Sequence, residues 1–360
     1  MVGGMFLAGL GCSVPSTRYR QTECWETLQS SGAYHQLAPR SQALLRKVLL
    51  GRNGIEARHL SLDRLEDAFV QEHDALHQRF SRNAPALATS AAEHALKAAG
   101  IGAGDIDAVL VATCTGYLCP GLTSHVTERL GLSPRIFALD LVGLGCGAAV
   151  PVLRTAQSIL AAGNARTVLC ICVEVSSAAF YLDDDPGVLI SACLFGDGAA
   201  AAICTTAPPT RGRSVRWISS ASDLTPADRE ALRLETRGGR LRNILTPQVP
   251  ALAGERVTAL CHRMLTDAGL PRTEIREWIL HPGGRDVLIA LQTGLGLAEN
   301  DLRHSASVLR IHGNMSSPCV LFALRSALEE NTPDGWWWLS SFGAGFSCHG
   351  ALLQVDSSLP

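Results

Sequence analysis

The sequence predicts an α/β protein made of two duplicated halves. Residues 99–106, where a glycine precedes a strand-like pattern, have a counterpart in residues 268–275, an offset of 268 − 99 = 169. Gly145-Cys146, which precedes small residues and a helical pattern, has a counterpart in Gly313-Asn314, an offset of 313 − 145 = 168. Separate motifs that repeat at nearly one distance indicate that a strand-and-helix unit is duplicated.

The expected halves are residues 1–205 and residues 215–360. The Pro-containing segment between them, Thr-Thr-Ala-Pro-Pro-Thr-Arg-Gly-Arg, fits neither a strand nor a helix. Each half needs the other to cover one face of its sheet, so we expect neither half to fold alone. If the halves pack about a pseudo-twofold axis, Cys146 and Asn314 approach one another.

The N-terminal half alternates strand and helix patterns. In chain order, the expected elements are a buried first strand within residues 1–14, helices within 20–50, an alanine-rich helix at 83–99 closed by Gly100, buried strands at 106–111 and 135–139, and a helix at 150–160. The small residues of the alanine-rich helix predict close packing against its neighbours.

Composition excludes several classes of protein. The chain has 360 residues, 47% of them hydrophobic and 18% charged, so it can bury a large core. The formal net charge of −2 gives no chain-wide attraction to nucleic acid, which we exclude as a partner. No apolar run has the length of a membrane span, and no Lys or Arg precedes the apolar start as in a signal peptide. The twelve cysteines form no small-domain disulfide framework, which favours a reducing, cytoplasmic location.

Cys146 lies at a predicted strand-to-helix turn with glycines on both sides. The glycines allow a sharp turn and leave room for a substrate to approach the sulfur. Helix N-terminal N–H groups nearby would favour the thiolate, the form in which cysteine is a nucleophile. The alternative is a small buried cysteine that only packs at the turn.

His281 and Asn314 occupy similar positions in the C-terminal half. His281 follows the apolar run Trp278-Ile-Leu280 and precedes Pro282-Gly-Gly284, so it projects from a strand end into a glycine-rich turn. Such a histidine is either a catalytic base or a structural turn residue. Asn314 is either a catalytic amide or a helix N-cap. The joint occurrence of Cys, His and Asn at turns of duplicated units favours a catalytic set.

Four segments carry a resemblance to a known family: Gly145-Cys146, Leu194-Phe-Gly-Asp-Gly-Ala-Ala200, His281-Pro-Gly-Gly284 and Gly313-Asn-Met-Ser-Ser317. In this order and spacing they resemble the thiolase superfamily and, within it, the type III polyketide synthases, which are the chalcone and stilbene synthase-like enzymes. Phe342-Gly-Ala-Gly345 is similar to the family's closing glycine loop. The resemblance implies a thiolase-like five-layered αβαβα fold and a homodimer.

The resemblance also implies an acyltransferase mechanism. Cys146 would carry the starter acyl group and then the growing chain as a thioester, while His281 would stabilise the thiolate as an ion pair. His281 and Asn314 would together donate hydrogen bonds to the thioester carbonyl of malonyl-CoA as carbon dioxide leaves. The substrates would be acyl-CoA and malonyl-CoA, with no metal and no further cofactor.

The same resemblance assigns residues to the substrate cavity and its entrance. Phe195 matches a gatekeeping aromatic, and Asn243 stands where the family has a second one. Cys114 and Ala179 match cavity-lining positions, and the small side chains at 114, 179 and 243 suggest an alkylresorcinol- or alkylpyrone-type product. Ser316, within the Gly-Asn-Met-Ser-Ser motif, completes the expected substrate contacts. A basic segment lies where the family binds the phosphates of CoA: Arg46, Lys47 and Arg52.

Three other functions fit parts of the pattern. Gly143-Leu-Gly145-Cys-Gly-Ala148 after a strand satisfies the dinucleotide-binding pattern, although no acidic residue is placed to hold the ribose. A ketoacyl-acyl-carrier-protein synthase III shares the Cys, His and Asn set but stops after one condensation. A non-catalytic acyl-binding partner subunit usually lacks the nucleophile, which this chain retains.

Overall fold

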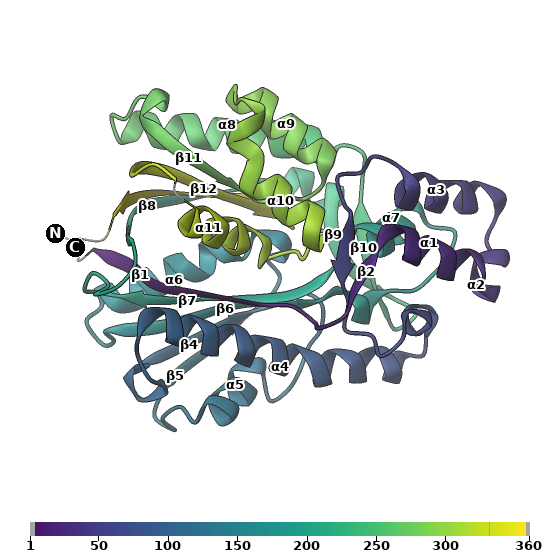
Figure 1. The fold of residues 1–360 in the computed structure, drawn as a ribbon, viewed down its shortest axis with the longest axis horizontal. Coiled ribbons are helices and arrows are strands. Elements are labelled where there is room, and N and C mark those ends of the chain that lie inside the picture. Colours follow the sequence, from purple (N-terminus) through teal and green to yellow (C-terminus); the bar gives the residue numbers. More distant parts are fainter. Residues whose placement is uncertain (1–3, 331, 358–360) are drawn as a thin grey trace.

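The computed structural model describes residues 4–330 and 332–357, which form five layers (Figure 1). Residues 1–3 of the expected first strand lie outside the described residues. Two sheets alternate with three helical layers, as the predicted five-layered fold requires. The strands of the first sheet, in spatial order, are β1 (Met5–Ser13), β7 (Asp197–Thr205), β6 (Thr167–Val175), β4 (Ala108–Ala112) and β5 (Phe137–Leu141). Those of the second are β8 (Ser214–Leu224), β13 (Ser347–Asp356), β12 (Gly335–Gly343) and β11 (Ile275–Leu280).

The two sheets repeat one pairing scheme. β4 pairs with β6 in parallel, and β7 pairs antiparallel with both β6 and β1. Likewise, β11 pairs with β12 in parallel, and β13 pairs antiparallel with both β12 and β8. A short antiparallel pairing between β1 and β8 joins the sheets along one edge, so all nine strands form one continuous hydrogen-bonded order.

The central helical layer is the apolar core of the molecule. It contains α6 (Ala149–Ala161) and α11 (Cys319–Glu329), which contact strands of both sheets. Each helix buries its apolar residues between the sheets, and polar residues such as Arg154 and Ser158 of α6 and Glu329 of α11 lie on the side that remains exposed. The expectation that each half covers the other's sheet therefore has a physical basis in this layer.

The outer layers consist of amphipathic helices. The helices over the first sheet are α4 (His73–Ala99) and α5 (Leu122–Leu130), and those over the second are α8 (Val249–Asp267) and α9 (Arg285–Leu295) (Figure 1). Helix α4 contains the alanine-rich segment, and Gly100 ends it in the left-handed conformation at φ +70°. Gly11 lets β1 approach α4 closely, because a Cβ atom at this position would lie 2.1 Å from the Ala91 carbonyl oxygen.

Smaller elements gather at one end of the molecule, beyond the sheets (Figure 1). They are α1 (Gln21–Gln29), α2 (Gly32–His35), α3 (Pro39–Leu50), α7 (Pro186–Leu194), the paired strands β2 (Arg18–Arg20) and β3 (Ala57–His59), and the hairpin of β9 (Leu232–Arg237) and β10 (Arg240–Leu245). Helices α1, α3 and α7 share an apolar cluster that includes Trp25, Leu45 and Leu189.

The duplication fails at one strand. An offset of 168 places the counterpart of β5 at residues 305–309, but this segment belongs to the helix α10 (Arg303–His312). The first sheet therefore has an edge strand that the second lacks.

The structure also corrects the prediction that residues 135–139 form a buried strand. The strand exists as β5, at residues 137–141, but it is the sheet edge and its side chains are exposed. An edge strand can carry apolar residues that face away from the core, which sequence alone does not distinguish from a buried strand.

No helix in the described part of the chain is both long and apolar enough to cross a membrane.

Candidate active site

An apolar cavity of about 340 Å³ lies against the turn that contains Cys146. Its wall includes most of the residues that the sequence assigned to a substrate site: Cys114, Cys146, Ala179, Phe195, Asn243 and Ser316. The residues come from both halves and from the β9–β10 hairpin, so only the folded chain brings them together. The volume lies in the lower part of the range for small-molecule pockets, about 300–1,000 Å³.

Cys146 belongs to a short 3₁₀ turn, Gly145–Gly147, between β5 and α6. Gly145 has φ +56°, a conformation that favours glycine. Gly147 packs against the C-terminal half, where a Cβ atom would lie 3.0 Å from the His349 ring. The Ser341 hydroxyl donates a hydrogen bond of 2.9 Å to the Gly147 carbonyl, which secures the turn from the other half.

Burial controls the ionisation of Cys146. Removal from water raises the pKa of the Cys146 thiol to about 12, and the charge of Glu174 acts in the same direction. A hydrogen bond from the Ser316 side chain and the backbone of Cys146 itself oppose this shift without cancelling it. The backbone N–H acts in the expected direction, towards the thiolate, but the effect of desolvation on the Cys146 pKa is larger.

His281 follows the last residue of β11, as predicted, and is 1% exposed. The edge of the Phe342 ring packs against the imidazole, with ring centroids 5.2 Å apart. Neither ring nitrogen has a hydrogen-bond partner among the described residues. Burial lowers the pKa of His281 to about 3, so this group by itself is neutral. Buried polar groups without partners are rare, and this one is available to a substrate or a neighbouring ionised group.

Asn314 is held by hydrogen bonds to backbone groups. Its Nδ2 donates to the Gly283 carbonyl at 3.1 Å, and its Oδ1 accepts from the Ser316 N–H at 2.8 Å. Its backbone forms an isolated β-bridge with Phe195. It is not a helix N-cap, the structural alternative, because α10 ends before it and α11 begins at Cys319.

A series of contacts connects the three predicted catalytic residues, from His281 through Asn314 to Cys146. The Gly283 N–H donates to the His281 carbonyl at 3.0 Å, and the Gly283 carbonyl accepts from Asn314. Asn314 in turn holds Ser316, whose hydroxyl contacts Cys146. Ser316 has φ 63°, and it is the one non-glycine residue with positive φ in the described part of the chain. Such a conformation costs free energy and is typical of functional sites.

Glu174 is the important residue that sequence reasoning missed. It is 0% exposed and lies on β6 behind the cavity wall. Its carboxylate accepts hydrogen bonds from both halves of the chain. The donors are the Cys114 N–H (3.0 Å) and Sγ (3.3 Å), and the hydroxyls of Thr113 (3.2 Å), Thr115 (2.9 Å), Ser316 (3.5 Å) and Ser317 (2.7 Å).

Burial raises the pKa of Glu174, and the surrounding donors oppose that shift. The Thr115 hydroxyl accepts the Val175 N–H at 2.9 Å, so its own proton is free to point at Glu174. One signal could have identified this residue: Glu174 is the single acidic residue in the otherwise apolar strand Thr-Val-Leu-Cys-Ile-Cys-Val-Glu-Val. An acidic side chain inside a buried strand requires donors around it.

The remaining predicted residues lie apart from the cavity wall. Arg46 and Lys47, on α3, and Arg52, just after it, are exposed and do not line the cavity. Within residues 4–330 and 332–357, no group of three His, Cys, Asp or Glu side chains is arranged to hold a metal ion. All twelve cysteines are free thiols.

The arrangement suits acyl transfer. A cysteine sulfur lines an apolar cavity, and hydrogen bonds through Gly283 and Ser316 connect it to a buried histidine and a fixed asparagine amide, neither of which lines the cavity. A thiol nucleophile with hydrogen-bond donors for a developing oxyanion is the minimum needed to form and resolve a thioester.

Comparisons with known proteins agree with this chemistry. The family models for the N-terminal and C-terminal domains of chalcone and stilbene synthases match residues 11–208 and 217–356. A 3,5-dihydroxyphenylacetyl-CoA synthase from Streptomyces toyocaensis is 30% identical over 359 residues, which cover 97% of this chain and 89% of the relative.

Two solved structures are also similar. PKS-I from the brown alga Ectocarpus siliculosus has a TM-score of 0.88 at 25% identity and covers 99% of both chains. The 1,3,6,8-tetrahydroxynaphthalene synthase from Streptomyces coelicolor A3(2), a bacterial type III polyketide synthase, has a TM-score of 0.87 at 25% identity. It covers 98% of this chain and 99% of its own.

Substitution of Glu174 tests its role in joining the two halves. Glu174→Gln replaces an acceptor oxygen with an amide that faces donors, and we expect the free energy of unfolding to fall by about 1–3 kcal/mol. Because burial raises the pKa of Glu174, the folded state binds its proton more tightly than the unfolded state. The parent protein should therefore exceed Glu174→Gln in free energy of unfolding by the largest amount near pH 4. This difference should decrease as the pH rises through the folded-state pKa of Glu174.

Urea denaturation at several pH values measures this difference. Glu93→Gln, at an exposed position on α4, is the matched control and should leave stability unchanged. A Glu174→Gln variant as stable as this control at every pH would show that the network does not hold the halves together.

Proposed function

The chain belongs to the chalcone and stilbene synthase family of type III polyketide synthases, and we propose that it extends an acyl-CoA starter with malonyl-CoA by repeated decarboxylative Claisen condensation. The observation that carries this proposal is the convergence of Cys146, Cys114 and Ser316 on one apolar cavity. The proposed steps need CoA thioesters and use no metal or further cofactor.

In the first proposed step, the Cys146 thiolate attacks the carbonyl carbon of the starter thioester. A carbon–sulfur bond to Cys146 forms, the bond to CoA breaks, and CoA leaves as a thiolate that takes up a proton. Burial alone would keep Cys146 protonated and His281 neutral. We propose that transfer of the Cys146 proton to His281 overcomes this, since the resulting opposite charges stabilise one another at a desolvated site.

In the second step, malonyl-CoA loses carbon dioxide and leaves an enolate. The His281 ring N–H and the Asn314 amide donate to the enolate oxygen. The Gly283 carbonyl occupies one amide proton of Asn314, so the other remains for the substrate. The enolate carbon then attacks the acyl thioester and releases the Cys146 thiolate, which lengthens the chain by two carbons.

We propose that cyclisation gives an alkylresorcinol- or alkylpyrone-type product. The cavity volume of about 340 Å³ limits the length of the polyketide chain that the cavity can enclose. Phe195 and Asn243 line the cavity together, and we propose that they control entry to it. The exposed Arg46, Lys47 and Arg52 are our candidates for binding the phosphates of CoA.

A panel of starters tests the proposed activity. Purified protein is mixed with malonyl-CoA and acyl-CoA starters from acetyl to dodecanoyl, and the products are identified by mass spectrometry. We expect products that contain more than one malonyl-derived unit, and none from Cys146→Ala. A single condensation with every starter would indicate the ketoacyl-acyl-carrier-protein synthase III type of reaction instead, and no condensation at all would refute the proposal.

The pH dependence of alkylation tests the Cys146–His281 pair. In His281→Ala no ion pair opposes the combined effect of burial and the neighbouring groups, which raises the pKa of Cys146 to about 12, so labelling by iodoacetamide should be slow at pH 7. Its rate should rise about tenfold per pH unit up to pH 10, because the thiolate fraction does. In the parent, the ion pair should keep the rate nearly constant over this range.

Peptide mass spectrometry distinguishes labelling of Cys146 from labelling of the other cysteines. The Cys146→Ser variant gives the background signal in the absence of this thiol. If the labelling rate of Cys146 in the parent protein rose as steeply with pH as the rate in His281→Ala, His281 would not stabilise the thiolate.

We also propose a cytoplasmic homodimer. Large apolar side chains are exposed along β5 and near it, including Phe137, Leu139, Val142 and Tyr117. An apolar sheet edge of this kind favours contact with another protein surface. Light scattering at micromolar concentration should give the mass of two chains, and Phe137→Asp should shift it toward one. A parent protein that is monomeric under these conditions would refute the dimer.

A further inference from the structure

The β9–β10 hairpin forms one wall of the cavity but belongs to neither large sheet. Leu234 and Asn243 face each other across the two strands, and both line the cavity. Arg242 is paired in register with Glu235 and does not line it. Side chains alternate along a strand, so Leu234 and Asn243 lie on a cavity face and Glu235 and Arg242 on a charged face, although Arg233 of the charged face also lines the cavity.

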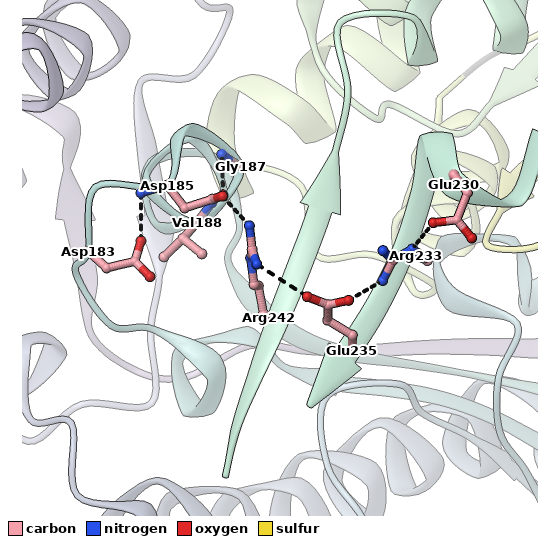
Figure 2. Close-up of polar contacts among 8 residues, drawn as sticks. All are labelled: Asp183, Asp185, Gly187, Val188, Glu230, Arg233, Glu235 and Arg242. Atoms are coloured by element: carbon pink, nitrogen blue, oxygen red, sulfur yellow. Dashed lines mark hydrogen bonds and ion pairs between the residues drawn. The ribbon is translucent and has the colours of Figure 1, made fainter. Parts of the chain in front are cut away.

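A chain of ion pairs runs along the charged face (Figure 2). The Arg242 guanidinium bonds Asp185 on one side and Glu235 on the other, the latter at 3.2 Å. Glu235 also bonds Arg233, which bonds Glu230 at 2.8 Å. Arg242 is the most buried member, with 14% of its side chain exposed. An ion pair withdrawn from solvent in this way is screened less by salt than one at the surface.

The chain of ion pairs fastens the hairpin to α7. Asp185 is the N-cap of that helix, where its Oδ1 accepts the Gly187 and Val188 N–H groups at 2.9 and 3.2 Å. Its other oxygen binds Arg242. Helix α7 contributes Val188 and Ser191 to the cavity and leads directly to Phe195. Arg242 therefore joins two separate walls of the same cavity.

Contacts beside the ion pairs show how closely these walls meet. The Asn243 Nδ2 donates to the Ser191 hydroxyl at 3.1 Å. A Cβ atom on Gly187 would lie 3.1 Å from the Asn243 carbonyl oxygen. The distance between the hairpin and α7 thus sets the width of the cavity at Asn243 and Ser191.

An alternative role for this cluster is to bind an acidic substrate group through Arg233, the one charged residue that lines the cavity in the described part of the chain. The charges disfavour it. With Arg229, which pairs with Glu230 at 3.5 Å, the cluster has three guanidinium groups against the three carboxylates of Asp185, Glu235 and Glu230, so 3 − 3 gives no net charge. A cluster whose charges are already paired offers little net attraction to a further anion.

We propose that Arg242 is a positioning residue that holds the β9–β10 hairpin against α7. It thereby limits the length of the starter acyl chain that the enzyme accepts and of the polyketide that it builds. This inference rests on the proposed polyketide synthase activity. Arg242 touches no substrate; it acts through the cavity wall. Loss of its ion pairs lets the hairpin move away from α7, so the cavity admits a longer starter or one more extension unit.

Arg242→Met tests the proposal, because methionine keeps much of the side-chain bulk without the charge. Hydrogen exchange measured by mass spectrometry should become about tenfold faster in residues 232–245, as expected when a local tether is lost. The share of products from longer starters, or with an additional malonyl unit, should rise at least about twofold, whereas malonyl-CoA decarboxylation should stay near the parent rate. Arg242→Lys, which retains the charge, should fall between Arg242→Met and the parent in both measurements.

A control removes an arginine ion pair elsewhere in the protein. Arg263 binds Asp223 through two nitrogens at 2.7 and 2.8 Å and does not line the cavity, so Arg263→Met should change neither measurement. Should Arg242→Met fold poorly, Glu235→Gln removes the neighbouring link on the more exposed side and should cause the same two changes, smaller in size.

Two results would overturn the inference. Unchanged exchange in residues 232–245 would show that the ion pairs do not hold the hairpin. Faster exchange with an unchanged product distribution would show that the hairpin does not limit chain length. A parent protein that makes no polyketide would refute the proposed function, and the exchange comparison would still show whether Arg242 holds the hairpin.

Discussion

The buried carboxylate of Glu174 is the interaction on which the site depends. Its donors come from residues 113–115, after a strand of the first sheet, and from residues 316–317, in the turn before α11. These segments are about two hundred residues apart in sequence and belong to different halves. A buried carboxylate is tolerated only when donors surround it, so the need to solvate Glu174 fixes both segments at once. Ser316, held in a strained conformation, is one of the residues placed in this way.

Desolvation has two opposite consequences at this site. It moves the pKa of Cys146 upward and that of His281 downward, so each group alone remains neutral. The same exclusion of water strengthens every interaction between charges that do form there. A site of this kind stabilises paired charges and destabilises single ones. Thioester chemistry with a thiolate and an enolate requires this condition.

Duplication explains why the functional groups converge and also why the halves differ. The turns at Cys146 and Asn314 occupy equivalent places before α6 and α11, the two helices of the central layer. Where the first half has β5 before its turn, the second half has α10. The first sheet therefore ends in an exposed apolar strand, and the second does not. The hairpin and α7 lie outside the repeat, and they supply Val188, Ser191, Leu234 and Asn243 to the cavity wall.

Local sequence patterns were enough to predict the strand-and-helix order, the duplicated turns and the position of Cys146 between glycines, because these follow from periodicity and turn chemistry. The family resemblance also grouped Cys114, Ala179, Phe195, Asn243 and Ser316, and these five residues do line one cavity, whereas Arg46, Lys47 and Arg52 do not. Four features emerge only in the folded chain: the role of Glu174, the exposure of β5, the direction of the Cys146 pKa shift and the Arg242 ion pairs. Each depends on which distant groups surround a side chain and on how much water they exclude, and neither quantity is a property of neighbouring residues in the chain.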